Sequence, residues 1–81
     1  GPKEQLAVTR VEAEGALYFP VVRGDAKLRY RSPAVRASVA AANGGFMLEL
    51  DEPAYAVARG QVAVVYDADA VVGAGVITNV A

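Results

Sequence analysis

The sequence predicts an all-β fold, a small closed barrel of about six mostly antiparallel strands. Val, Ile, Thr, Tyr and Phe recur in short runs that Gly, Pro, Asn and Asp interrupt, and no stretch has the periodicity of an amphipathic helix. The chain has 81 residues, so we expect one domain over residues 1–81. In a domain of this size we favour closure of the sheet, because it leaves no exposed strand edge.

The N-terminal third predicts three short strands. Residues 6–13 contain valines among polar residues, and residues 21–22 extend a strand before a turn at residues 23–25. Residues 27–31 then alternate strictly. Since successive side chains of a strand face opposite sides, three basic residues share one face of this run. They are Lys27, Arg29 and Arg31.

The middle of the chain predicts a β-hairpin. Residues 35–41 alternate, with Arg36 on the face opposite to the valines, and Pro33 separates this run from the one before. Asn43-Gly44 predicts a type I′ turn, in which both central residues have positive φ. The returning strand covers residues 46–50, with Phe46 facing inward, and ends at residues 51–53.

The C-terminal part predicts two more strands. Residues 54–60 have no clear period and form a connection with at most one helical turn. Residues 61–66 carry Val on both faces, which is typical of a central, well-covered strand. A turn at residues 67–69 leads into the last strand, residues 71–77. Gly73 and Gly75 lie on one face of that strand, where glycine marks a close approach or a tight barrel corner.

The composition excludes several classes of function. His and Cys are both absent, which removes the commonest general base, any Ser-His or Cys-His nucleophile pair and any thiolate metal site. Asp67 and Asp69 lie in a tight turn, where a hydrogen bond to the local backbone explains them better than acid–base chemistry. We therefore predict no catalytic residue, no metal and no cofactor in this chain.

The hydropathy pattern predicts neither a membrane partner nor a signal peptide. No apolar run approaches the ~20 residues of a membrane helix, and no charged-then-apolar leader opens the chain. The absence of Cys agrees with a cytoplasmic location. The net charge is −1, but the middle of the chain is basic and the part after Arg36 is acidic, with Arg59 its only basic residue.

The second half also carries a series of short motifs. In order they are Leu50-Asp51-Glu52-Pro53, Ala56-Val57, Gly60-Gln61, Ala63-Val64-Val65-Tyr66-Asp67 and Gly73-Ala74-Gly75-Val76-Ile77. This series resembles the C-terminal β-barrel domain of the bacterial tRNA 2-thiouridylases. The basic run ahead of Pro33 and the Gly1-Pro2 start are similar to the family as well, although Gly1-Pro2 also fits a remnant of protease cleavage.

Two residues depart from the family pattern. Arg59 stands where the family usually has Pro, and Ala74 stands where a further Gly is common. Neither change harms a strand, but the turn at Arg59 loses the φ restraint of Pro.

The resemblance implies a six-stranded barrel similar to the second domain of elongation factors. It also implies a parent enzyme that activates a tRNA wobble uridine with ATP and replaces an oxygen by sulfur through a persulfide on Cys. That chemistry belongs to an N-terminal nucleotide-binding domain, and this chain has neither its Ser-Gly-Gly-x-Asp-Ser loop nor any Cys. The implied partners are tRNA and the parent catalytic domain.

The basic run is the candidate RNA-binding site. Evenly spaced cations suit a phosphate backbone, but a charged strand face that keeps a barrel soluble has the same pattern. The candidates are Lys27, Arg29, Arg31 and Arg36. Tyrosines could stack on bases, although packing in the core or at its rim explains them better; they are Tyr18, Tyr30 and Tyr55. Glu49 and Asp51 share a strand face, from which they could pair with the basic run within the barrel or between molecules.

The sequence thus predicts a non-catalytic accessory domain that helps a tRNA 2-thiouridylase to hold tRNA. The alternative is a structural module that packs on the catalytic domain, or associates with itself, and never touches RNA. The salt dependence of binding separates these two hypotheses, because contacts with phosphate weaken steeply as salt rises.

Overall fold

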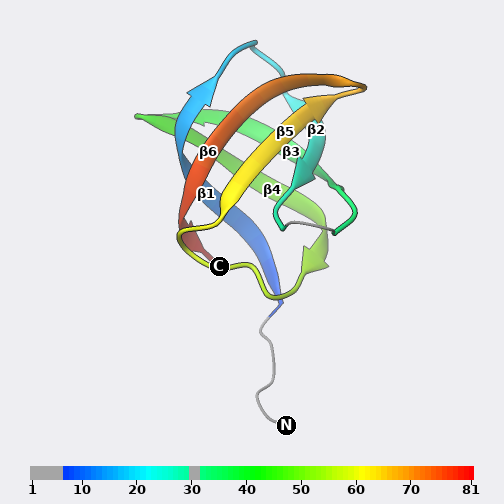
Figure 1. Cartoon of the computed structure of the whole chain (residues 1–81), viewed down its shortest axis with the longest axis vertical. Coiled ribbons are helices and arrows are strands. Elements are labelled where there is room, and N and C mark those ends of the chain that lie inside the picture. The colour runs from blue at the N-terminus through cyan, green and yellow to red at the C-terminus, as the bar shows by residue number, and fades with distance from the viewer. Residues whose placement is uncertain (1–6, 30–31) are drawn as a thin grey trace, which may run out of the picture.

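The computed structural model describes residues 7–29 and 32–81, which form a closed antiparallel barrel with the strand order β1-β4-β3-β2-β5-β6 (Figure 1). The predicted fold class is therefore confirmed. The strands are β1 (Val8–Leu17), β2 (Arg23–Lys27), β3 (Val35–Ala42), β4 (Gly45–Ala54), β5 (Val62–Asp67) and β6 (Ala70–Val80).

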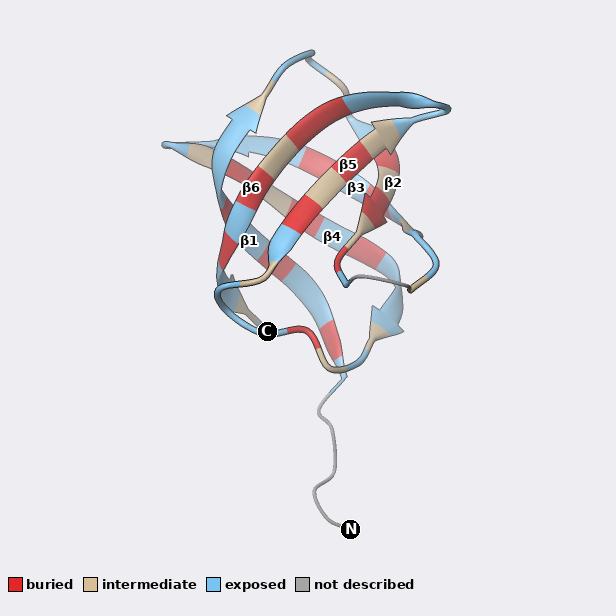
Figure 2. Cartoon of the chain, in the orientation of Figure 1, coloured by how far each residue is buried: buried red, intermediate tan, exposed pale blue. Residues whose placement is uncertain are grey.

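The core fills the inside of the barrel and is mainly aliphatic. Buried and exposed positions alternate along the strands, as the banding of Figure 2 shows. Each large side chain buried in this way contributes about 1.5–3 kcal/mol to folding. The largest fully buried side chains are Phe46, Leu48, Ile77, Val11 and Val65.

The predicted strand at residues 27–31 is wrong over its described part, because β2 ends at Lys27 and residues 28 and 29 lie outside any strand. The predicted turn at residues 23–25 is part of β2. Gly24 faces inward, and a Cβ atom added there would lie 2.8 Å from Val65 Cγ1 and 2.9 Å from the Tyr66 carbonyl oxygen. The glycine is therefore explained by the close approach of β5 and not by a turn. Tyr30 and Arg31 lie outside the described residues.

The predicted hairpin between β3 and β4 is confirmed at Asn43-Gly44. The turn is not of type I′, however, because φ is positive at Gly44 (77°) and not at Asn43. The returning strand also continues past its predicted end, and Ala54 pairs with Val8 of β1. Pro53 is tolerated there because it lies in an irregular stretch of the β1–β4 ladder, where its missing N–H costs no ladder hydrogen bond.

The first and the last two strands match their predictions in part. β1 extends the predicted strand to Leu17. The connection before β5 contains no helical turn, and β5 is covered on its inner face only, since Val62 is 55% exposed. The inward glycines of β6 do mark a close approach, because a Cβ atom at Gly75 would lie 2.6 Å from the Glu14 carbonyl oxygen of β1.

Candidate nucleic-acid interface

The described candidate cations do not share one strand face. Lys27 is the last residue of β2, Arg29 lies in the connection that follows, and Arg36 lies on β3. Lys27 is half-buried, whereas Arg29 and Arg36 are exposed. Arg31 is outside the described residues, so its place in the site stays a prediction.

Arg36 is held by an acid on the neighbouring strand. It pairs in register with Asp25 of β2, and its Nη1 donates to Asp25 Oδ1 at 3.4 Å. Both side chains are about half exposed, so this ion pair contributes at most about 1 kcal/mol. Its consequence is electrostatic: the positive charge of Arg36 is largely balanced on the barrel itself.

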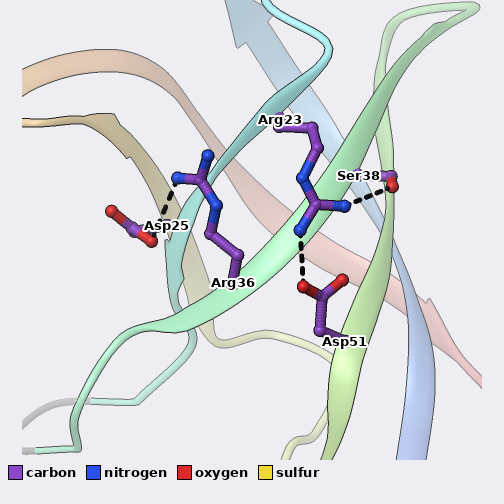
Figure 3. A network of polar contacts seen from close by, with 5 residues as sticks. All are labelled: Arg23, Asp25, Arg36, Ser38 and Asp51. Carbon is purple, nitrogen blue, oxygen red and sulfur yellow. Dashed lines mark hydrogen bonds and ion pairs between the residues drawn. The ribbon is translucent and has the colours of Figure 1, made fainter.

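Two further ion pairs continue this arrangement across the outer surface, and Figure 3 shows one of them, Arg23 with Asp51, beside the pair of Arg36 with Asp25. Arg23 of β2 donates to Ser38 Oγ at 3.1 Å and to Asp51 Oδ2 at 2.5 Å. Arg10 of β1 donates to Glu49 Oε2 of β4 through Nε and Nη2. We call the outer surface of β1, β4, β3 and β2, with its three ion pairs, the charged face.

The predicted pairing of Glu49 and Asp51 within the barrel is therefore found, but with different partners. These acids engage Arg10 and Arg23, neither of which belongs to the predicted basic run. The two-residue period of a strand correctly placed Glu49 and Asp51 on one face. It could not identify the strand that would supply their partners, because that depends on the strand order of the closed barrel.

Lys27 and Arg29 are placed differently from Arg36. Among the described residues, no carboxylate lies within 4.0 Å of either side chain. Both line a groove of about 490 Å³ between the end of β2 and β5. Arg29 also lines a second groove, of about 510 Å³, whose wall includes Asp51 and Glu52. The first groove thus holds two cations that have no carboxylate of the described residues within ion-pair distance; Arg59, in the connection before β5, is the other described cation without one.

The first groove contains an aromatic residue that the sequence analysis did not name among the candidates for stacking on bases. Tyr66 lies on β5 beside Asp25, and the groove is completed by Gln61, Val62 and Val64. Tyr66 is two residues after Val64 on β5, so both side chains face outward, and this alternation is the signal that could have identified Tyr66.

The aromatic candidates lie outside this groove or outside the described residues. Tyr18 and Tyr55 are more than half exposed, which excludes them from the core and leaves packing at its rim as the prediction for both. Phe19, beside Tyr18, is exposed to 57% and was not predicted as a candidate. Tyr30 lies outside the described residues, and its role stays a prediction.

The described part of the chain contains no cluster of three or more acidic side chains placed to hold a metal ion, and no buried polar or charged side chain. None of the described residues belongs to a helix that could cross a membrane. What the surface offers is electrostatic and apolar contact.

Comparison with known proteins gives one consistent result. Residues 5–77 match the family model of the aminomethyltransferase beta-barrel domain. The chain is 38% identical over 82 residues to a tRNA-specific 2-thiouridylase of Helicobacter hepaticus, covering 98% of this chain and 24% of the relative. An enzyme of the same name from Helicobacter acinonychis is 41% identical over 80 residues, which cover 95% of this chain and 23% of the relative. Another, from Campylobacter concisus, is 37% identical over 84 residues, which cover 98% of this chain and 25% of the relative. The chain thus spans about a quarter of the length of these relatives.

Proposed function

This chain belongs to the aminomethyltransferase β-barrel domain family, in the group formed by the C-terminal barrels of tRNA-specific 2-thiouridylases, and from this premise we propose that it is a non-catalytic accessory domain that helps the enzyme to hold tRNA. The chemistry, an ATP-dependent thiolation of the wobble uridine, takes place in the remainder of the enzyme. The barrel supplies contacts with the tRNA backbone.

One observation carries the proposal. Lys27 and Arg29 lie together in a groove and have no carboxylate within ion-pair distance in the described part of the chain. Unpaired cations can exchange their counterions for phosphates, and the released counterions drive binding. Arg10, Arg23 and Arg36 would first have to leave their acids. The groove is therefore the best phosphate site on the described surface.

The charge balance of the chain sets the scale of this contribution. With a net charge of −1, the barrel has no broad positive field to attract RNA from a distance. Affinity of the isolated domain is expected on the order of 10⁻⁴ M or weaker, as for non-specific binding at physiological salt. The barrel thus supports tRNA binding within the enzyme and does not act as an independent RNA-binding protein.

The test uses the full-length enzyme that contains this barrel. Lys27→Gln with Arg29→Gln is compared with a control pair that removes the same charge from the charged face, Arg10→Gln with Arg23→Gln. Dissociation constants for tRNA are measured over a series of salt concentrations. We expect the first pair to weaken binding at low salt and to reduce the log–log salt slope by about 1–2, since each lost phosphate contact lowers the slope by about 1.

The control pair should leave that slope unchanged. Equal slopes for both pairs and the unaltered enzyme would show that the groove makes no phosphate contact.

A second candidate function is a docking module without any RNA contact. The observation that favours it is the internal pairing of the cations, since three arginines of the described surface are each held by an acid of the barrel. Under this hypothesis, removing the barrel from the enzyme lowers its stability but leaves the salt slope of tRNA binding intact.

A further inference from the structure

The outer surface of β5 and β6 is aliphatic. Val62 faces Val76 directly across the two strands, and Val64 faces Ala74. These four residues point away from the core, and Val62 and Val76 remain exposed to 55% and 46%. We call this surface the aliphatic face, made of Val62, Val64, Ala74 and Val76.

Exposed single valines are ordinary on a protein surface, but this set is contiguous. The aliphatic face also has a polar rim, because Lys27 of β2 pairs in register with Val64 and Glu14 of β1 pairs in register with Val76. An apolar centre flanked by charged residues is the usual anatomy of a protein–protein interface.

The position of the aliphatic face indicates what covers it. Val62 is the first residue of β5, and β5 runs in the same direction as β1, because each is antiparallel to β6. Both strands therefore begin toward the same end of the barrel (Figure 1), and Val76, opposite Val62, pairs in register with Glu14 in the second half of β1. In the relatives, about three quarters of the chain lies outside the segment that matches this barrel, so a large covalently linked body has to be accommodated.

We propose that the aliphatic face is the surface by which this barrel packs on the remainder of its own enzyme. Strand addition cannot provide the contact, since the barrel is closed and has no free strand edge. Val62 and Val64 also line the groove proposed for phosphate, so burial of the aliphatic face would cover that side of the groove and leave Lys27 at the rim of the interface. The inference rests on the proposed function only in taking the chain as a domain of a larger enzyme, and it requires no contact with RNA.

The test compares accessibility in the 81-residue chain and in the full-length enzyme without tRNA. Cysteine is introduced as Val62→Cys or Val76→Cys, and its alkylation rate is followed by peptide-resolved mass spectrometry. The chain has no cysteine of its own, so a label in a barrel peptide reports the introduced thiol. The matched control is Val22→Cys, in the connection between β1 and β2, where Val22 is 75% exposed.

We expect alkylation at positions 62 and 76 to slow by about tenfold or more in the enzyme, because an interface core excludes solvent, whereas position 22 keeps its rate. Equal rates at position 76 in chain and enzyme would overturn the proposal. Protection that develops only when tRNA is added would overturn it in favour of an RNA surface. Protection already present in the isolated chain, with a dimer in sedimentation, would overturn it in favour of a second copy.

Failure of this proposal is distinguishable from failure of the proposed function. The salt slope of tRNA binding depends on Lys27 and Arg29 and is measured on variants that keep the aliphatic face intact. A normal slope effect without protection at position 76 would leave the tRNA-holding function standing.

Discussion

The two outer faces of the barrel are built from opposite kinds of residues. The charged face spans β1, β4, β3 and β2 and places three arginines against three acids. The aliphatic face spans β5 and β6 and places valine against valine. Both faces stand on the same buried core, so the core does not explain the difference between them.

This difference indicates what each face meets. Cross-strand ion pairs satisfy their own charges in water and contribute little to stability when exposed, so the charged face needs no partner. Aliphatic side chains gain free energy only when they leave water. The aliphatic face therefore gains from a partner, and the groove at its border with β2 holds two cations that no acid of the described residues pairs with.

The largest expected effect is at Gly24, where β2 of the charged face packs closely against β5 of the aliphatic face. Gly24→Val would press against Val65 Cγ1 and the Tyr66 carbonyl oxygen, which both lie within 3 Å of the place that a Cβ atom would take. We expect the free energy of unfolding to fall by about 2–3 kcal/mol, because β2 must move away from β5. Urea denaturation measures this loss. Ala40→Val, at an exposed position of β3, adds bulk without a clash and should change little; equal losses in both variants would contradict the close approach.

A smaller effect is expected within the charged face. In a double-mutant cycle of Arg23→Ala and Asp51→Ala, the coupling free energy should be about 0.2–1 kcal/mol, since these side chains are 40% and 44% exposed. Denaturation at low salt and near 1 M salt gives the two values to compare. The coupling should shrink at high salt, where the screening length is about 3 Å. A coupling that does not change with salt would mean that the pair acts through packing.

The smallest effect is expected on the aliphatic face of the isolated chain. Val62→Thr with Val76→Thr keeps the β-branched shape and changes only outward atoms, so the free energy of unfolding should move by about 0.5 kcal/mol or less. Thermal and urea denaturation of the 81-residue chain test this. A loss above about 2 kcal/mol would mean that these valines support the barrel itself, and would weaken the case that they await a partner.

Much of the fold could be predicted because local signals agreed with the tertiary structure. Asn43-Gly44 and the alternation after it located a hairpin, and Gly73 with Gly75 marked a close contact in the last strand. The prediction failed at β2, where Gly24 and Asp25 are turn-forming residue types used inside a strand. It failed again after Leu50, where Pro53 falls in an irregular part of a ladder.

The candidate site was less predictable than the fold. Lys27 and Arg29 were identified, but as members of one strand face that does not exist. The pairing of Arg36 with Asp25, and of Arg23 with Asp51, joins residues on different strands that are 11 and 28 positions apart in sequence. Charge counting along the chain cannot detect such pairing, and so it overestimated the free positive charge.

By itself the sequence determined the fold class and, for most strands, which side chains face inward, because these follow from residue type and from the two-residue period of a strand. It also determined that the side chains commonly required for hydrolytic, thiol and metal chemistry are absent, because that follows from residue type alone. The tertiary structure alone decided which cations are neutralised and that the outward valines of β5 and β6 form one surface. The physical reason is that both depend on which strands become neighbours when the barrel closes, and strand order is a property of the whole chain.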